Sequence, residues 1–336
     1  MQLHQLNRRT LITGLGGAVA AWPVGAAAEQ SDRMPRIGVL MAYPESDPEA
    51  QARVAAFRDG LQKLGWTEGR NIRLEIRWAA PDDPESRLQL AKELVALQPD
   101  LLLSHGTPNT ATLLQQTRTI PIVFAALSDP VGSGFVASFS RPGGTVTGFA
   151  NMEPTMASKW LELLKEVAPR VERVAILFNP ATAPYAEYWQ NPFKAAATSL
   201  AVEASAAHVH ATWELESVVA AHANAPNGGL IVMPDTFTST HRAEIVALAA
   251  LHRLPAVYPF RFFTELGGLL SYGNDLIDDF RRAASYADRL LMGARPSELP
   301  VQFPVKFELV INMKTTKALG LEMPATVLAR ADEVIE

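Results

Sequence analysis

The sequence predicts an α/β protein built from two units of similar plan, each a parallel β-sheet covered by helices. Three observations predict this fold. Short apolar runs alternate with apolar residues at helical spacing along the chain, a pattern typical of parallel sheets. The alternation pauses around residues 138–151 and then restarts. A chain of 336 residues is also long for one ordinary domain, which favours two.

The first unit begins with a predicted buried strand at 36–42, "RIGVLMA". Val54, Phe57, Leu61 and Leu64 then recur at helical spacing, and Gly65 ends that helix. Further predicted strands lie at 72–78, 100–104 and 120–126, with helices around 90–97 and 109–117 between them.

The second unit starts just past Thr147 and has the same plan. Predicted strands lie at 173–179, 201–209, 228–235, 254–260 and 267–273, and helices at 160–167, 193–200 and 243–252. A helix at 276–292 and a long extended segment from 301 follow. Neither unit needs this terminal piece, so we expect it to cross back and tie the two together.

Composition excludes several classes of function. There is no cysteine, so disulfides, zinc–thiolate sites, cysteine nucleophiles and lipid attachment through an N-terminal cysteine are ruled out. The net charge of -5 and the lack of a Lys/Arg run argue against a nucleic-acid partner. There is no H-E-x-x-H, G-x-S-x-G or Walker A motif. His208 and His210 form a pair that we interpret as surface residues rather than a metal site, since no third ligand is in view.

The N-terminus resembles an export signal. Arg8 and Arg9 precede a mildly apolar stretch at 11–21, and a small-residue cleavage pattern ends at Ala28. The paired arginines favour the twin-arginine type, although the general secretory route and an uncleaved membrane anchor stay open. We therefore expect residues 1–28 to be removed and the mature protein to lie outside the cytoplasm.

Ligands of open parallel sheets bind beyond the carboxyl ends of the strands. There, "SHGTPNTAT" supplies Gly106 for a tight turn, Thr107 as a helix cap and Pro108 for the first helical position. The helix N-terminus, with hydroxyls of Ser104, Thr107 and Thr110, predicts a carboxylate site. Ordinary helix capping is the alternative.

Two acidic residues end strands in different units, Asp129 and Asp235, and each is placed to face a ligand ammonium group. The alternatives are a turn starter for Asp129 and a helix cap for Asp235. Aromatic residues near the strand ends suit apolar ligand parts, although most aromatics belong to cores. They are Tyr43, Tyr185, Tyr188, Trp189, Tyr258 and Tyr272.

The segment "SFSRPGGTVTGFAN" at 138–151 resembles a phosphate-binding loop in its glycine pair and small hydroxyl residues. However, no Lys follows its glycines and no helix pattern begins after them. We interpret 142–144 as a tight turn and 145–149 as a strand crossing into the second unit. Thr147 and Gly148, together with Gly273, are then the predicted hinge residues.

Four stretches carry a family resemblance: "IPIVFAALSDPVGSGFVASFSRPGGTVTGF", "ELLKEVAPRVERVAILFNP", "RLPAVYPFRFFTELGGLLSYG" and "KFELVINMKTTKALGLEMP". Together they resemble the ABC-transporter substrate-binding proteins of the tryptophan/tyrosine-binding type, which are type I periplasmic binding protein-like. The resemblance implies two Rossmann-like lobes with parallel sheets and a three-crossing hinge. We expect lobe 1 at 33–147 plus 273–311, and lobe 2 at 148–272 plus 312–336.

The resemblance also implies a function. A periplasmic, monomeric protein would capture a small ligand, an amino acid or a related compound, in the cleft between the lobes. It would deliver that ligand to an inner-membrane ABC permease and its ATPase. No catalytic residue, cofactor or metal is expected. A ligand-sensing module for a membrane receptor and an α/β enzyme are the alternatives.

By position, the loop at 104–110 would take a carboxylate, Ser128 and Asp129 would lie beside the amine, and Asp235 and Tyr272 would contribute from the other side. "YPFRFF" at 258–263 stands where many relatives carry a charged segment. The full expected ligand-binding set is Tyr43, Ser104, Gly106, Thr107, Thr110, Ser128, Asp129, Asn179, Tyr185, Asp235, Tyr258 and Tyr272.

Overall fold

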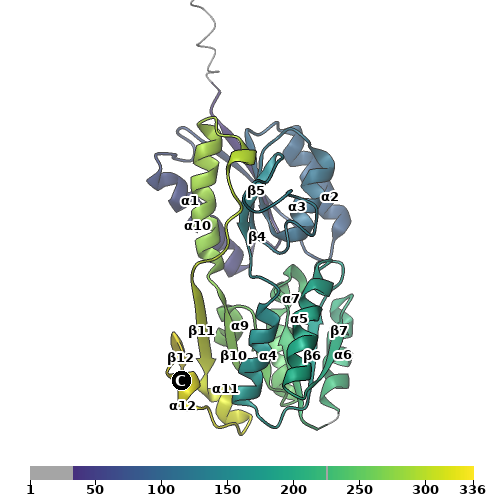
Figure 1. Ribbon diagram of the computed structural model, residues 1–336. Coiled ribbons are helices and arrows are strands. Elements are labelled where there is room, and N and C mark those ends of the chain that lie inside the picture. Colours follow the sequence, from purple (N-terminus) through teal and green to yellow (C-terminus); the bar gives the residue numbers. More distant parts are fainter. Residues whose placement is uncertain (1–32, 225) are drawn as a thin grey trace, which may run out of the picture. The chain divides into compact units, whose positions relative to one another are not determined.

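The computed structural model describes residues 33–224 and 226–336 of the chain, and residues 34–336 form one compact unit. Figure 1 shows two lobes in this unit, each a β-sheet with helices packed on it, as the sequence predicts. The expected signal peptide at 1–28 lies outside the described residues.

Lobe 1 contains a five-stranded, fully parallel sheet in the order β2-β1-β3-β4-β5. Its strands are β1 (Arg36–Met41), β2 (Arg73–Trp78), β3 (Leu101–His105), β4 (Ile122–Leu127) and β5 (Val146–Ala150). The helices that cover it are α1 (Pro48–Lys63), α2 (Pro84–Ala96), α3 (Gly106–Gln116) and α10 (Leu276–Leu291).

The apolar run of β1 explains its place in the middle of this sheet. Ile37 and Val39 belong to the core beneath α1 and α10, whereas Leu40 belongs to the core beneath α2 and α3. Successive side chains of a strand point to opposite faces, so a strand buried on both faces needs a continuous apolar run. The carboxyl ends of β1, β3 and β4 all meet at the edge that faces lobe 2.

Lobe 2 contains a seven-stranded sheet in the order β12-β11-β10-β9-β8-β6-β7, parallel except where β11 runs antiparallel to β10. Its strands are β6 (Arg173–Phe178), β7 (Glu203–His208), β8 (Gly228–Val232), β9 (Ala256–Tyr258), β10 (Leu270–Asn274), β11 (Phe307–Asn312) and β12 (Glu333–Ile335).

The helices of lobe 2 follow the same alternation. They are α4 (Met156–Val167), α5 (Ala186–Ser199), α6 (Leu215–Ala223), α7 (Thr236–Thr240), α8 (Arg242–Leu251), α9 (Arg261–Glu265), α11 (Met313–Ala318) and α12 (Ala325–Leu328). Two short 3₁₀ helices complete the described elements, η1 (Thr212–Glu214) and η2 (Pro296–Glu298).

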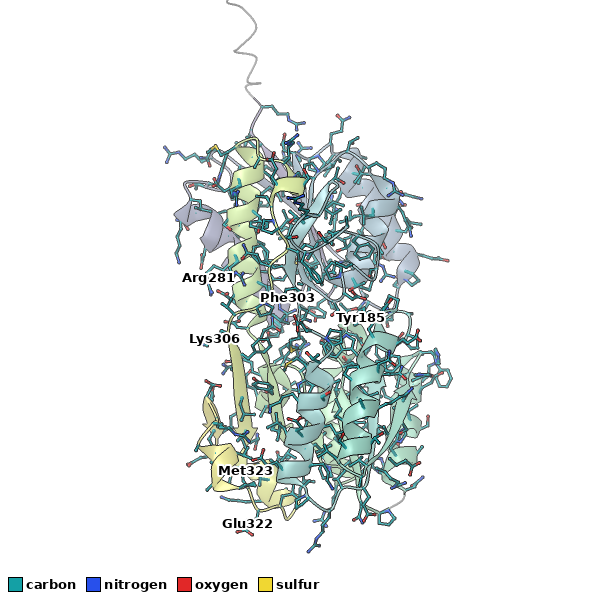
Figure 2. The ribbon with its side chains drawn as sticks, viewed as in Figure 1. Tyr185, Arg281, Phe303, Lys306, Glu322 and Met323 are labelled. Atoms are coloured by element: carbon teal, nitrogen blue, oxygen red, sulfur yellow. The ribbon has the colours of Figure 1, made fainter. Side chains whose placement is uncertain are left out.

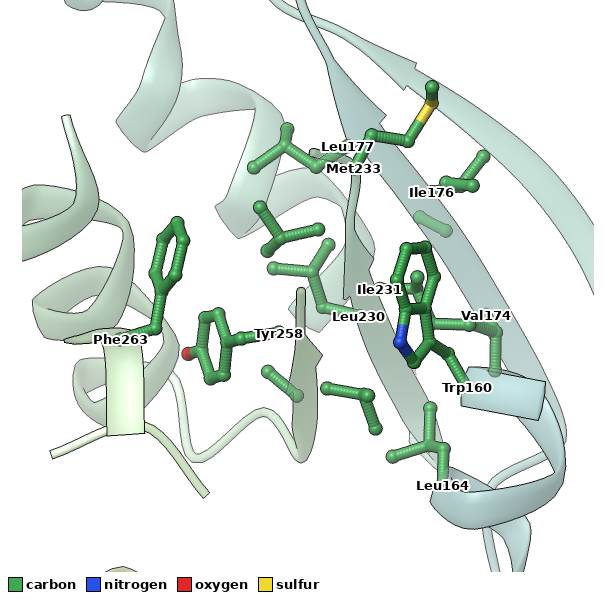
Figure 3. Close-up of a cluster of buried hydrophobic side chains, with 14 of the residues drawn as sticks. Trp160, Leu164, Val174, Ile176, Leu177, Leu230, Ile231, Met233, Tyr258 and Phe263 are labelled. Atoms are coloured by element: carbon green, nitrogen blue, oxygen red, sulfur yellow. The ribbon is translucent and has the colours of Figure 1, made fainter. Parts of the chain in front are cut away.

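Large aromatic side chains fill the core of lobe 2. The rings of Trp160 and Trp189 stack at 5.3 Å, and Tyr258 stacks on Phe263 at 5.0 Å. Figure 3 shows Tyr258 and Phe263 packed together within this cluster. Burial raises the pKa of the Tyr258 hydroxyl. Tyr258 is therefore a core residue of lobe 2, although the sequence suggests it as a ligand contact.

The chain crosses between the lobes three times, but not at the residues expected from the sequence. The crossings lie between β5 and α4, between β10 and α10, and between Gln302, which bridges to β5, and β11. The expected boundaries assign 307–311 to lobe 1, yet β11 pairs with β10 in the lobe 2 sheet. Strand pairing of this kind depends on contacts far apart in sequence, which a local pattern does not encode.

The expected hinge residues lie inside strands. Thr147 and Gly148 are buried in β5, and Gly273 is buried in β10. A Cβ added to Gly148, whose φ is 151°, would lie 2.1 Å from the backbone oxygen of Phe124. A Cβ on Gly273 would lie 1.8 Å from the backbone oxygen of Pro259. Both glycines permit close packing of neighbouring backbones, and the crossings lie a few residues farther along the chain.

Candidate functional site

A small cavity lies where the two lobes meet, and both lobes line it. Its volume is about 20 Å³. We call it the inner cavity. Its lining residues are Tyr43, His105, Gly106, Thr107, Pro108, Ala126, Asn151, Thr182, Tyr185, Pro234, Asp235, Thr236, Ser239, Phe260 and Leu276.

The N-terminus of α3 forms the lobe 1 wall of this cavity. The helix starts at Gly106, two residues before the predicted first helical position Pro108, and its N-cap residue His105 makes no side-chain capping hydrogen bond. The Thr107 hydroxyl donates to the backbone oxygen of Ser128 at 3.2 Å and accepts from its N–H at 3.3 Å. Thr107 thus ties α3 to the end of β4, and the backbone N–H groups at the helix start carry the positive end of the helix dipole.

Two hydroxyls that the sequence assigns to the ligand are engaged within the protein. Ser104 and Thr110 are fully buried, and their hydroxyl oxygens lie 2.8 Å apart. Thr110 also donates to the backbone oxygen of Gly106 at 2.9 Å. Neither residue lines the inner cavity. Their role in the structure is to hold the turn at Gly106.

A buried polar layer supports the cavity from lobe 1. The His105 ring lies edge-on to Tyr43 at 4.9 Å, and the Arg53 guanidinium lies over the Tyr43 ring at 4.9 Å. Burial, with the neighbouring Arg53 charge, lowers the pKa of His105 well below its usual range. His105 is therefore neutral, and Tyr43 is held between two buried groups.

Asp235 lines the inner cavity from lobe 2. Its carboxylate accepts from the N–H of Thr238 at 2.9 Å, the hydroxyl of Thr182 at 3.1 Å and the N–H of Asn179 at 3.2 Å. Burial raises the pKa of Asp235 to about 6, against an ordinary value of 3.8. The carboxylate caps α7, which was the alternative to ligand binding. The hydroxyls of Thr236 and Ser239, which also line the cavity, have no hydrogen-bond partner among the described residues.

Tyr185 lies between the lobes, as Figure 2 shows. It is buried, and its hydroxyl donates to the backbone oxygen of Pro234 at 2.7 Å. Burial and the nearby Asp235 carboxylate raise the pKa of this hydroxyl. One face of Tyr185 therefore closes the inner cavity, and the residue also borders a second space.

That second space, which we call the outer chamber, has a volume of about 430 Å³. Thr107, Pro108 and Tyr185 line both spaces, so the two adjoin. The other residues of the outer chamber are Arg87, Ala111, Thr112, Gln115, Asp129, Gly132, Ser133 and Phe135 from lobe 1, and Ala181, Pro184 and Tyr188 from lobe 2. Small-molecule sites usually measure about 300–1,000 Å³, a range that includes the outer chamber.

A family model described as ABC transporter substrate binding protein matches residues 38–335. The chain belongs to this family.

Relatives agree with this assignment. The chain is 24% identical over 307 residues to the tyrosine-binding protein of Clostridioides difficile strain R20291, covering 87% of this chain and 83% of that one. It resembles the crystal structures of a conserved domain protein from Vibrio cholerae, at 27% identity, and of an ABC domain in complex with L-Trp from Streptococcus pneumonia, at 26% identity. Both have a TM-score of 0.83 and cover 90% of this chain and 100% of their own. The fold is that of type I periplasmic binding proteins.

This substrate-binding protein holds its two lobes together with charged and aromatic contacts. Arg242 of lobe 2 pairs with Asp47 of lobe 1 at 2.7 Å, and both side chains are largely buried. The Phe262 ring of lobe 2 lies 5.4 Å from the Arg242 guanidinium and 5.7 Å from that of Arg53 in lobe 1. The segment 258–263 thus contributes an aromatic ring to the lobe contact.

The structure distributes the sequence-predicted ligand residues over four places: the inner cavity, the outer chamber, the layer behind their walls and the core of lobe 2. Tyr43, Gly106, Thr107, Tyr185 and Asp235 line the inner cavity, and Asp129 lines the outer chamber. Ser104, Thr110, Ser128 and Asn179 are buried behind these walls. Tyr258 and Tyr272 do not line either space. The Tyr272 ring packs 6.0 Å from Phe307 in lobe 2.

Sequence reasoning missed several lining residues. Asn151 and Thr182 follow the carboxyl ends of β5 and β6, so the same strand-end rule could have found them. Arg87 lies within α2, where no such rule applies.

Two kinds of feature are absent from the described residues of this substrate-binding protein. Within residues 33–224 and 226–336, no group of His, Asp and Glu side chains could hold a metal ion. The same residues include no helix with the length and apolarity needed to span a membrane.

Proposed function

We propose that this substrate-binding protein captures an amino acid with an aromatic side chain in the cleft between its lobes and delivers it to an ABC permease. Export to the periplasm and import through the inner membrane are part of the proposal. The observation that carries it is the pair of adjoining spaces lined by both lobes, which a ligand would bridge on closure.

The chemistry of these walls suits an amino acid. Backbone N–H groups at the start of α3 and the unpartnered hydroxyls of Thr236 and Ser239 offer hydrogen bonds to polar atoms. Tyr185 and Tyr188 offer aromatic faces to an apolar side chain. A relative described as a tyrosine-binding protein and a similar structure solved in complex with L-Trp support the aromatic class.

The test is a thermal-shift screen against the twenty L-amino acids, run after co-purified ligand has been removed by unfolding and refolding. A ligand that binds only the folded state stabilises it by about 2.7 kcal/mol at a hundredfold excess over its dissociation constant. We expect L-tryptophan or L-tyrosine to raise the melting temperature most. A screen in which no amino acid raises it would refute amino-acid binding.

Thr107 provides a matched pair of variants. Thr107→Val removes the hydroxyl that joins α3 to Ser128 and should weaken ligand binding measured by calorimetry, since two hydrogen bonds at the cleft wall are lost. Thr107→Ser keeps the hydroxyl and should bind nearly as wild type. Transport itself is tested by uptake of labelled L-tryptophan and L-tyrosine in cells with and without the gene.

A further inference from the structure

We infer that the outer chamber is where the ligand sits, with Arg87 binding its carboxylate and Asp129 binding its ammonium group. This rests on the proposed function and deepens it, because it names the two charged contacts. It also moves the carboxylate from the loop at 104–110, where the sequence alone places it, to a residue of α2.

The two spaces differ in volume. The inner cavity, at about 20 Å³, holds roughly one water molecule. The outer chamber, at about 430 Å³, has room for a whole amino acid. With the lobes arranged as described, a ligand therefore lies in the outer chamber and reaches the inner cavity at most with one polar group.

Arg87 lines the outer chamber and is only 9% exposed. Its Nη1 donates to the backbone oxygen of Pro81 at 3.2 Å, whereas its buried Nε has no hydrogen-bond partner among the described residues. A buried guanidinium with an unused N–H is costly unless an acceptor arrives, and a carboxylate is the acceptor that guanidinium groups bind most strongly.

Asp129 also lines the outer chamber. Its Oδ1 accepts from the N–H of Gly132 at 2.8 Å, but its buried Oδ2 has no hydrogen-bond partner among the described residues. A Cβ on Gly132 would lie 2.0 Å from that oxygen, so a side chain at position 132 would displace the Asp129 carboxylate from this position. The backbone of Asp129 has a φ of 49°, a left-handed conformation that tends to persist at functional sites.

The two charges together define the ligand class. Arg87 and Asp129 line one chamber, yet no ion pair within 4.0 Å joins them among the described residues. Burial lowers the pKa of the Arg87 guanidinium, and the neighbouring Asp83 carboxylate acts in the opposite direction. A cation and an anion that line one chamber without pairing with each other complement a zwitterion. Tyr188, 52% exposed, and Tyr185 supply the aromatic wall from lobe 2. We therefore expect a free aromatic amino acid rather than an amine, an acid or a blocked peptide.

The variants are chosen to change charge with little change in shape. Asp129→Asn keeps an oxygen to accept from Gly132, and asparagine tolerates a left-handed φ. Arg87→Gln removes the guanidinium, and Arg87→Lys keeps the charge without the planar fork. Arg118→Gln and Asp59→Asn change exposed residues of lobe 1 and serve as controls. Melting temperatures without ligand show whether each variant is folded.

Three probes separate the two contacts by calorimetry: L-tryptophan, tryptamine, which lacks the carboxylate, and indole-3-propionate, which lacks the ammonium group. The corresponding tyrosine set is L-tyrosine, tyramine and 3-(4-hydroxyphenyl)propionate. Arg87→Gln should weaken binding of the amino acid and of the acid by at least about tenfold and leave binding of the amine unchanged. Asp129→Asn should weaken binding of the amino acid and of the amine and leave binding of the acid unchanged. The affinities of Arg87→Lys should lie between those of wild type and Arg87→Gln.

Equal losses for all three probes, or no loss in a folded variant, would overturn the assignment of Arg87 and Asp129. If Thr107→Val and not Arg87→Gln removes the preference for carboxylate-bearing probes, the carboxylate lies at α3 instead. These outcomes differ from failure of the proposed function, in which wild type binds neither amino acid.

Discussion

Asp235 is a buried carboxylate that also caps a helix, and these two properties act in opposite directions on its charge. Burial disfavours the ionised form, whereas donors from Thr238, Asn179 and Thr182 favour it. Burial is the larger effect, and the pKa rises to about 6. The ionised carboxylate at neutral pH is therefore tolerated by the fold at a free-energy cost.

That cost predicts a pH dependence of stability. The folded-state pKa of Asp235 is raised above its ordinary value of 3.8, so the stability linked to its protonation is full below that value and is lost as the pH rises through about 6. Over this window the loss amounts to roughly 3 kcal/mol, since one pKa unit is about 1.36 kcal/mol. In Asp235→Asn this dependence should vanish, which urea unfolding between pH 4 and 7.5 measures directly.

The control for Asp235→Asn is an aspartate that caps a helix without being buried. Asp83 caps α2 by accepting from the N–H of Ser86 at 2.9 Å, and it is exposed. Asp83→Asn should lose little stability and keep the wild-type pH dependence. Parallel curves for wild type and Asp235→Asn would show that Asp235 does not titrate in this window.

At the residue scale, the sequence predicts part of the site. The strand-end rule selects Gly106, Thr107 and Asp129, which line the inner cavity or the outer chamber. It does not select Arg87, because a lone arginine in a helical pattern is indistinguishable from a surface residue until tertiary packing buries it. Ser104 and Thr110 show the converse: their hydroxyls suit a ligand in composition, but they bond to each other.

At the scale of elements, β5 shows how one local pattern is compatible with two roles, a hinge and a close packing contact. Gly148 lies mid-strand in the lobe 1 sheet, paired opposite Phe124 of β4. A side chain there would collide with the backbone of β4, which cannot rotate away as a side chain could. Gly148 therefore serves the packing of lobe 1, and we expect its substitution to affect folding.

Gly148→Ala should lower the free energy of unfolding by about 3 kcal/mol or more, combining a backbone overlap with an unfavourable φ for alanine. Gly144→Ala is the matched control, because no atom lies within 4 Å of a Cβ added there. It should change stability by less than about 0.5 kcal/mol. Chemical unfolding of both variants tests this. An intact Gly148→Ala with altered ligand affinity would instead support the hinge interpretation.

The order of elements was predictable, but the pairing of some was not. β1 and β6 are continuous apolar runs, and their burial on both faces follows from that composition. The run of β11 is equally clear, yet its partner β10 lies more than thirty residues earlier, beyond α10 and its following turn. Such distant contacts decide which lobe a strand joins. The observed lobe boundaries therefore differ from the predicted ones, although the strands lie close to their predicted positions.

For the whole molecule, the ion pair Arg242–Asp47 is one of the contacts that join the lobes. Asp47 uses Oδ1 to cap α1 and Oδ2 to accept from Arg242, so one carboxylate serves both lobes. Arg242 also donates to the backbone oxygen of Ser239 at 2.8 Å, beside the inner cavity. Because the apparent affinity for a ligand scales with the populated fraction of the closed form, loss of this pair should weaken binding from outside the ligand site.

Arg242→Gln should therefore lower ligand affinity by roughly tenfold, about 1.4 kcal/mol, mainly through faster dissociation measured by stopped-flow fluorescence. Small-angle scattering should show a larger radius of gyration for the ligand-free variant. Arg261→Gln is the control, because the ion pairs of Arg261 with Glu308 and Glu333 lie within lobe 2. Asp47→Asn should reproduce the effect, and the double variant should add little to either single change. Additive losses, or an unchanged dissociation rate in Arg242→Gln, would show that closure does not depend on this pair.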